Sequence, residues 1–369
     1  MGGYALIGIA CYRHGTRIAT PLGDVPVEAL RIGGAVLTAS GRVRPIRWIG
    51  RCSYSAEAVG SNRQIQPIRI AAGALDGELP RRDLWVSSDH ALLVASEGSE
   101  VLVPAYLLVN GASITRQSSA KPVSYLSIEL DRHEAILAEG QAAETFLDNK
   151  TRAIFANAAE YAALYPHAGQ PNAQYCAPYA TGAVLARIRA RLDRLAQLAL
   201  GPLDSHVDVA TRVSVSGWAH DRANPASPVL VEILVNDATA GFVLADHFRA
   251  DLRAAGIGDG YCSFSFCLPT PLSAGQRHII SVRRAADGVG LFGGLVLIDR
   301  GEDPHSLIAG TLRQHAPAAI AESRADIARF LAAQIDMLRR RPGGGGDSLG
   351  RLGRQGLRHL IDASGQQRR

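Results

Sequence analysis

Residues 11–149 alternate between apolar and polar side chains in short runs that end at proline or glycine. The run "RIATPLGDVPVEALRIGGAVLTASGRVRPIRWIG" shows this alternation between its breaks, as is typical of short strands. The stretches "LWVSSDHALLVA", "EVLVPAYLLV" and "VSYLSIELDRHEAILAEG" continue the same pattern. Many short strands separated by close turn signals predict a compact all-β unit.

The pattern changes to a helical period over residues 150–204. "TRAIFANAAEYAALY" and "GAVLARIRARLDRLAQLAL" place apolar residues three and four positions apart, and prolines separate the two stretches. We therefore expect a helical connector that docks on a neighbouring part of the chain.

Strand patterns return over residues 205–300 and predict a β-sandwich. In "YCSFSFCL" the alternation places Cys262 on the core face and Cys267 on the opposite face. Residues 303–341 are rich in Ala, Leu and Ile and predict a helix. The "PGGGG" run opens a flexible basic tail over residues 342–369. The expected fold is mainly β, with residues 1–10 as a short leader.

The amino-acid composition limits where in the cell we expect the protein. The chain is 47% hydrophobic and 20% charged, which is ordinary for a soluble globular protein. No apolar run approaches the ~20 residues needed to span a bilayer. The start "MGGYALIGIA" lacks the basic region of a secretory signal. We expect a cytoplasmic protein by default, with non-classical secretion left open.

The distribution of charge and the cysteine content limit the kinds of ligand that we expect. The net charge is +5, and the last 33 residues hold eight Arg and two Asp, so the tail is basic and the body is close to neutral. Such a tail either attracts nucleic acid or anionic lipid or is simply solvated. We favour a solvated tail over a nucleic-acid partner. The five cysteines are odd in number and show no CxxC spacing. We expect neither a metal nor a cofactor.

Cys11 is the candidate nucleophile, placed just before "RHGTRIATP". A thiolate beside the Ala10 carbonyl can attack it intramolecularly and convert the amide into a thioester. The departing Cys11 amine needs a proton, which a histidine can supply as general acid. A hydroxyl three residues earlier can hold the amide or its developing oxyanion. Ser87 and His90 in "SSDH" fit these two roles.

The order of these stretches resembles the Hint (hedgehog/intein) domain, most closely the bacterial type often called Hint-2. The resemblance covers residues 10–150 and includes "CYRHGTRIATPLGDVPVEAL", "DLWVSSDHALLV", "VLVPAYLLVNGASI" and "YLSIELDRHEAILAEGQAAETFLD". It implies an all-β horseshoe of two related halves over residues 11–149. It also implies self-processing, with a thioester at the first residue of the domain and release of the upstream segment.

By position, the resemblance makes Cys11 the nucleophile and places Ser87 and His90 at the ends of the family's Thr-x-x-His motif. His133 falls where inteins carry a second histidine, and Asp131 becomes a candidate activator of an incoming nucleophile. The family's threonine is serine here, which keeps the hydroxyl.

Two further departures bear on the reaction. Gly33-Gly34 replaces the usual Gly-Asp, so one carboxylate is missing. Asn149 is followed by Lys150 rather than by Cys, Ser or Thr, which argues against splicing. The resulting expectation is a single-turnover cysteine autoprotease that cleaves Ala10–Cys11 and releases its own N-terminal segment to water, a thiol or an alcohol. The alternative is an inert Hint scaffold in a bacterial binding or adhesion protein.

Residues 205–300 also resemble a β-sandwich module that is appended to bacterial Hint proteins and some glycosyltransferases. The quoted similarity lies in "VSVSGWAHDRANPASPVLVEILVND" and "DHFRADLRAAGIGDGYCSFSFCLP". Two readings stay open: a module that binds carbohydrate or protein, and a spacer.

Overall fold

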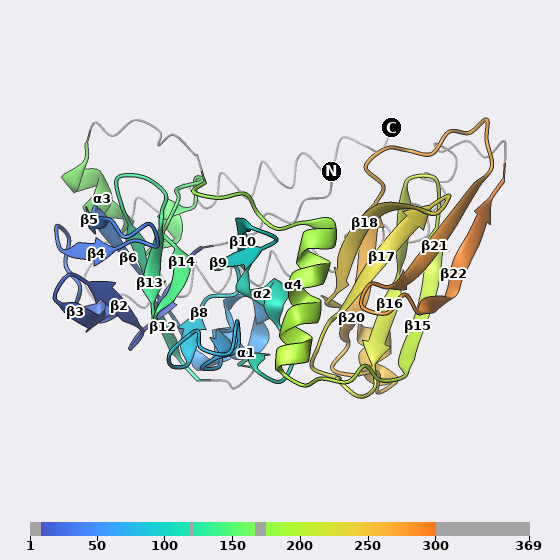
Figure 1. Cartoon of the computed structure of the whole chain (residues 1–369), viewed down its shortest axis with the longest axis horizontal. Helices are drawn as coiled ribbons and strands as arrows, with labels where there is room; N and C mark the ends of the chain where they lie inside the picture. The colour runs from blue at the N-terminus through green and yellow to red at the C-terminus, as the bar shows by residue number, and fades with distance from the viewer. Residues whose placement is uncertain (1–8, 118–120, 167–174, 300–369) are drawn as a thin grey trace, which may run out of the picture. The chain divides into compact units, whose positions relative to one another are not determined.

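The computed structural model describes residues 9–117, 121–166 and 175–299, and this part of the chain is mainly β (Figure 1). The described residues fall in one compact unit. The helix predicted for residues 303–341 and the basic tail at 342–369 lie outside the described residues. No helix among the described residues is long and apolar enough to cross a membrane.

The first part of the fold contains two six-stranded sheets and a hairpin, all with antiparallel pairing. The first sheet has the order β11-β7-β8-β1-β12-β6, and the second has the order β10-β9-β14-β13-β2-β3. The strands are β1 (Tyr12–Arg13), β2 (Arg17–Thr20), β3 (Gly23–Pro26), β4 (Ala35–Leu37), β5 (Val43–Pro45), β6 (Trp48–Tyr54), β7 (Ile68–Ile70), β8 (Leu84–Val86), β9 (Ala91–Ser96), β10 (Ser99–Pro104), β11 (Ile114–Arg116), β12 (Val123–Glu129), β13 (Ala135–Ala138) and β14 (Gln141–Glu144).

Strand β1 occupies the middle of the first sheet, and this position sets up the site. Tyr12 pairs with Val86 of β8 on one side and with Leu126 of β12 on the other. All three side chains are buried, so the hydrophobic effect fixes this register against a one-residue slip. The residue before β1 is therefore held between the end of β8 and the middle of β12.

Short helices interrupt the strands of the first part, and one of them corrects the sequence reading. "EVLVPAYLLV" has a strand pattern throughout, but β10 ends at Pro104 and the next residues form α2 (Ala105–Leu108). The N–H groups of Ala105 and Tyr106 bind the carbonyls of His90 and Ser88, which turns the chain away from the sheet. The other short helices are η1 (Val27–Ala29), α1 (Ala56–Ser61) and η2 (Arg63–Ile65).

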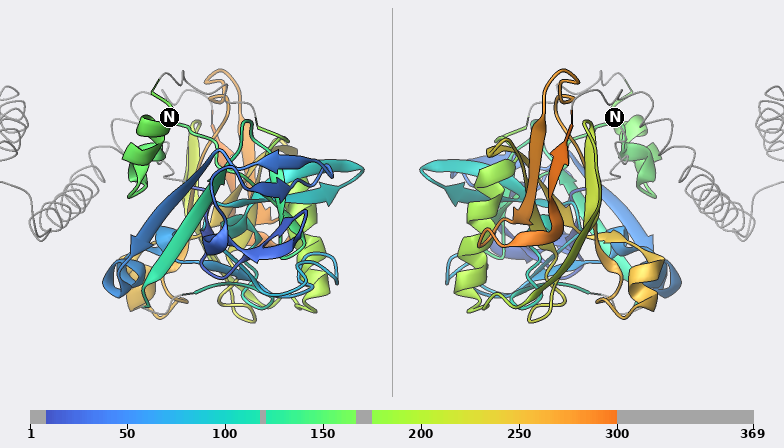
Figure 2. Two further views of the ribbon diagram at one scale, coloured as in Figure 1. Left: turned by 90° about the vertical axis from the view of Figure 1, so that its left-hand side faces the viewer. Right: turned by 90° about the vertical axis from the view of Figure 1, so that its right-hand side faces the viewer.

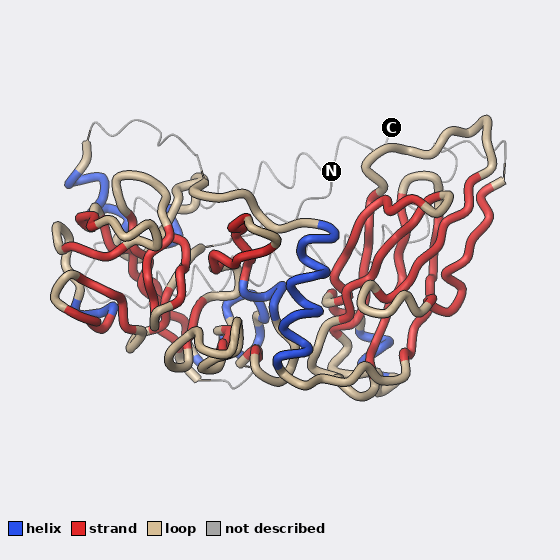
Figure 3. The backbone as a smooth tube through the Cα atoms, viewed as in Figure 1, coloured by secondary structure: helices blue, strands red, loops and turns tan. Residues whose placement is uncertain are grey.

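The connector contains the two helices that its periodicity predicts, both shorter than their patterns. They are α3 (Ala158–Leu164) and α4 (Gly182–Leu195), preceded by η3 (Arg152–Ile154). Helix α4 is the longest helix among the described residues (Figure 3). Its buried side chains Leu185, Ile188 and Leu192 belong to the same hydrophobic cluster as the first part of the fold.

Two four-stranded sheets follow and share a second hydrophobic core, as the sandwich prediction requires. Their orders are β15-β16-β20-β19 and β18-β17-β21-β22, with β21 and β22 facing the viewer in the right panel of Figure 2. Cys262 is buried and Cys267 is exposed, as the alternation indicates. The elements are β15 (Leu203–Ala210), β16 (Ser214–Asp221), β17 (Val229–Val235), β18 (Ala238–Ala245), β19 (His247–Phe248), α5 (Ala250–Ala254), β20 (Tyr261–Cys267), β21 (His278–Arg284) and β22 (Gly290–Ile298).

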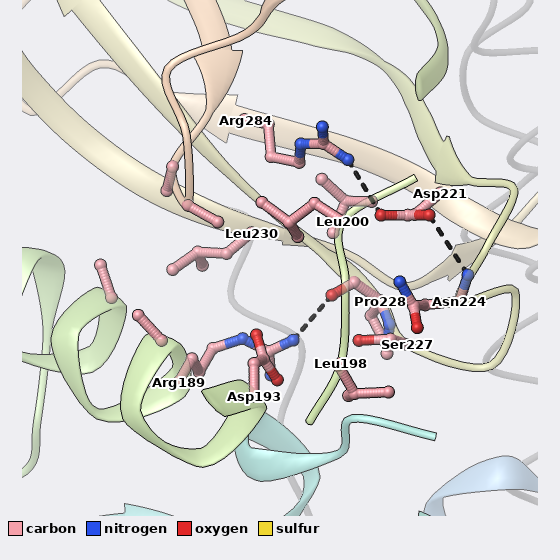
Figure 4. Close-up of a pocket in the computed structure, with 15 residues that line it drawn as sticks. Arg189, Asp193, Leu198, Leu200, Asp221, Asn224, Ser227, Pro228, Leu230 and Arg284 are labelled. Carbon is pink, nitrogen blue, oxygen red and sulfur yellow. Dashed lines mark hydrogen bonds and ion pairs between the residues drawn. The ribbon is translucent and has the colours of Figure 1, made fainter. Parts of the chain in front are cut away.

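Arg189 of α4 joins the two parts of the fold. Its buried guanidinium donates to the carbonyls of Leu107 in α2 and Val109 just after it, and to that of Pro228 before β17 at 2.8 Å. A cavity of about 40 Å³ lies beside it, lined in part by Asp193 and by the ion pair of Asp221 and Arg284 at 2.9 Å (Figure 4). The guanidinium groups of Arg189 and Arg284, which line this cavity, already bind acceptors within the protein. The cavity therefore belongs to the packing around α4.

Candidate active site

The Ala10–Cys11 peptide bond is hydrogen-bonded through both of its polar atoms. The Cys11 N–H donates to Ser87 Oγ at 3.0 Å, and the Ala10 carbonyl accepts from Ser127 Oγ at 2.5 Å. Ser87 Oγ in turn donates to the Ile9 carbonyl at 2.5 Å, and its own N–H donates to the Cys11 carbonyl at 2.9 Å. Two hydroxyls from β12 and from the turn after β8 thus hold this peptide in one orientation.

The Cys11 thiol lies in a hydrophobic pocket, only 1% exposed. Burial raises its pKa well above the usual thiol value, while a hydrogen bond to Ser127 acts in the opposite direction. The Cys52 side chain of β6 is the other hydrogen-bonding neighbour, and the hydrogen bond from Cys11 lowers the pKa of Cys52. The resting Cys11 side chain is therefore a protonated thiol near neutral pH, in contact with a second thiol.

His90 is completely buried beside Cys11. Its Nε2 lies 3.0 Å from the Glu144 carbonyl oxygen, which only accepts, so this nitrogen carries the proton. Within the described part of the chain, its Nδ1 has no hydrogen-bond partner. Burial lowers the His90 pKa, against the raising effect of the Glu144 charge and of backbone groups of Cys11 and Glu144. The ring is thus a neutral imidazole with an unpaired basic nitrogen, and the backbone of Cys11 is one of its neighbours.

His133 lies in the same interior but is linked to His90 through Glu144. His133 Nε2 is 3.2 Å from Glu144 Oε2, and both side chains are almost fully buried. The same residue, Glu144, accepts from His90 through its main-chain carbonyl. The structure therefore brings together four of the five predicted side chains: Cys11, Ser87, His90 and His133. They lie around one hydroxyl residue, Ser127, and one carboxylate residue, Glu144, which the sequence did not indicate.

Asp131 lies apart from this group. Its side chain is 49% exposed and pairs with Arg44 at 3.4 Å. The reason is local, since Asp131 follows β12 in the turn where the chain leaves the sheet. The structure does not bring this carboxylate to Cys11.

Ser127 and Glu144 are the site residues that sequence reasoning missed. Each lies within a strand, at a position that an alternating pattern assigns no special role. The sequence signal for these residues is weak: Ser127 is a small polar residue in the mostly buried run of β12, and Glu144 is a charged residue that follows two alanines. Among the described residues, no group of three or more His, Cys, Asp or Glu side chains is arranged to hold a metal ion.

Comparison with known families identifies the first part of the chain. The family model described as Hint domain matches residues 10–150, the segment that contains Cys11, both serines and both histidines. Residues 10–150 form a Hint domain. In the general sense, this is an autoprocessing domain of the Hint type. The chain continues beyond it into α4 and the sandwich.

The solved structures that the chain matches include an intein-like domain and two inteins. The bacterial intein-like domain from Clostridium thermocellum has 17% identity and a TM-score of 0.27, over 37% of this chain and 97% of that one. The gp41-1 intein has 12% identity and a TM-score of 0.25, over 36% of this chain and 97% of that one. The Msm DnaB1 intein splicing domain bound with zinc has 12% identity and a TM-score of 0.25, over 37% and 98%. No curated protein sequence matches the chain.

Proposed function

We propose that the Hint domain cleaves its own Ala10–Cys11 bond through a thioester and does not splice. The observation that carries the proposal is the hydroxyl contact on each side of this peptide: Ser87 at the Cys11 nitrogen and Ser127 at the Ala10 oxygen. An ordinary buried peptide in a strand pairs with backbone groups of its neighbours. A peptide held by two serine hydroxyls beside a thiol is arranged for acyl transfer.

The first step is an isomerisation in which protons balance. Cys11 Sγ loses its proton and attacks the Ala10 carbonyl carbon, while Ser127 donates to the oxygen as negative charge develops on it. The C–N bond then breaks, and the Cys11 nitrogen leaves with one proton. His90 Nδ1 is the basic atom that can take the thiol proton and return it to this nitrogen.

The second step regenerates the thiol. A nucleophile such as water, a thiol or an alcohol attacks the thioester carbon, the C–S bond breaks, and the proton of the nucleophile passes to Cys11 Sγ. Residues up to Ala10 leave as an acid, thioester or ester. The burial of Cys11 supports small acceptors for this step.

Intact mass spectrometry on the full chain with an N-terminal tag tests the proposal. With hydroxylamine or dithiothreitol, we expect loss of the mass that precedes Cys11. Cys11→Ala should abolish the loss, and Ser127→Ala should slow it by about 10²-fold, the usual effect of removing one oxyanion donor. Cys267→Ser removes an exposed thiol of β20 and should leave the rate unchanged.

A second candidate function is an inert Hint scaffold, and the burial of Cys11 with its raised thiol pKa favours it. The same experiment separates the two functions. If the folded, tagged chain keeps its full mass through days of incubation with hydroxylamine, the cleavage proposal is wrong and the scaffold function stands.

A further inference from the structure

A segment beyond the Hint match contacts the histidines of the site. We call residues 175–180 the strap. It runs beside β10, where the Leu102 N–H donates to the Pro178 carbonyl at 2.9 Å and the Ala180 N–H donates to the Leu102 carbonyl at 2.8 Å. The strap therefore lies on the Hint domain as an added stretch of parallel pairing, about 25 residues after the family match ends.

The strap sets the protonation pattern of His133. The Cys176 N–H donates to His133 Nδ1 at 3.0 Å, and the Tyr175 ring meets the imidazole edge-on at 5.3 Å. A backbone N–H can only donate, so Nδ1 must carry a lone pair and the proton of the neutral ring lies on Nε2. That proton points to Glu144 Oε2 at 3.2 Å.

The strap also holds the Glu144 carboxylate. The Tyr179 hydroxyl donates to Oε2 at 3.0 Å, and the Ala91 N–H donates to Oε1 at 2.8 Å. Glu144 is only 5% exposed, so these donors replace water around its charge. Its main-chain carbonyl binds His90, which connects the strap to the residue beside Cys11.

We propose that the strap is a positioning element of the Hint site: it fixes His133 as the Nε2–H tautomer and fixes the Glu144 carboxylate between His133 and Tyr179. Processing at Cys11 then depends on a segment that follows the Hint domain in the chain. Tyr179 and Glu144 are positioning residues in this scheme, because they act through the histidines. The rate effect rests on the proposed cleavage, whereas the tautomer does not.

The first test reads the tautomer in the full chain by ¹⁵N NMR of labelled histidine. The wild-type protein should show His133 protonated at Nε2 alone, near neutral pH. Cys176→Pro removes the N–H that binds Nδ1 and should give a mixture of tautomers. Cys176→Ala keeps that N–H and removes only the thiol, so it should preserve the wild-type signals.

The second test uses the cleavage rate with hydroxylamine. Tyr179→Phe removes one donor from Glu144 and should slow cleavage roughly tenfold, the value of one hydrogen bond to a charged group. Glu144→Gln keeps the shape but removes the charge that faces His133, and it should slow cleavage at least as much. Tyr261→Phe, in the sandwich, is the matched control and should not change the rate.

The outcomes separate this inference from the proposed function. If His133 is protonated at Nδ1 in the wild-type chain, or if Tyr179→Phe and Glu144→Gln cleave at the wild-type rate, the positioning role of the strap is wrong. If no variant cleaves and the wild-type chain does not cleave either, the proposed function fails, while the tautomer measurement still decides the contact. Should Cys176→Pro not fold, Tyr179→Phe read by the same NMR signals takes its place, with altered His133 signals expected.

Discussion

The chemistry of Cys11 depends on the balance between burial and hydrogen bonding around one sulfur atom. Burial disfavours the thiolate, and the Ser127 hydroxyl favours it, with burial the larger effect. A raised pKa means that the thiolate fraction is small at neutral pH and grows about tenfold for each added pH unit until the pKa is reached. In the proposed reaction neutral His90 takes the thiol proton, so the reacting pair is the neutral thiol with the neutral imidazole, and the rate does not follow this fraction.

The rate of cleavage at Cys11 should therefore change little between pH 7 and pH 9. We expect a slope of about zero in a plot of the logarithm of the rate against pH, measured by intact mass at fixed hydroxylamine concentration. Burial raises the pKa of Cys11 and lowers the pKa of His90, so both groups stay neutral over this range. A slope of about one would contradict the prediction, because it would mean that the attacking thiolate forms by loss of the proton to solvent and not by proton transfer to His90.

At the residue scale, the sequence indicates the candidate reactive groups but not the residues that hold them in place. Cys11, Ser87 and His90 were identifiable because an ordered motif connects residues 76 and 79 positions apart. Ser127 and Glu144 were not, since their roles come from pairing between β1 and β12 and between β14 and its neighbours. A hydroxyl or carboxylate in a strand carries no local signal for the long-range contact it will make.

At the scale of elements, α2 and α4 support the turn that carries His90. The N–H groups of α2 bind the Ser88 and His90 carbonyls, and carbonyls at the C-terminal end of α2 bind Arg189 of α4. Hydrogen bonds therefore run from α4 through α2 to the His90 turn. The helical period predicted α4 well, because its apolar face is long, whereas the four residues of α2 are too few for any periodicity to appear.

Arg189→Met should destabilise the chain by about 3 kcal/mol, because it leaves buried carbonyls at the end of α2 and before β17 without a donor. Urea unfolding measures this loss. Hydrogen exchange should also become faster at the amides of Ala105 and Tyr106. Arg187→Met is the matched control two residues away in α4, where an exposed ion pair with Glu97 is worth less than about 0.5 kcal/mol. Equal effects of the two substitutions would show that the buried Arg189 contacts do not support α2.

At the scale of the whole molecule, one hydrophobic cluster passes from the Hint domain through α4 to β17 and β18. It joins core residues of both six-stranded sheets to Leu185 and Ile188 of α4 and to Leu230 and Leu244. Sequence patterns divided the chain into a Hint unit, a connector and a sandwich, and those boundaries stay predictions. Patterns of this kind indicate where separate hydrophobic cores form. They do not show that a connector helix contributes to one of those cores.

Because of this shared cluster, the Hint domain and the sandwich should unfold together. Pulsed hydrogen exchange with mass spectrometry over a urea series can follow peptides from β9 and β17 separately. We expect one common midpoint, as for a single cooperative unit. Two clearly separated midpoints would mean that α4 connects the two parts without coupling their stability.

The contacts on the scissile peptide also determine which sequences the site would tolerate. Ser87 and Ser127 bind the carbonyl groups of Ile9 and Ala10, which every amino acid provides. The side chains of these two residues are themselves buried, so their volume is restricted. In the proposed reaction, the protein interior around these two residues would thus act as a steric filter on the departing segment, with small side chains favoured at position 10.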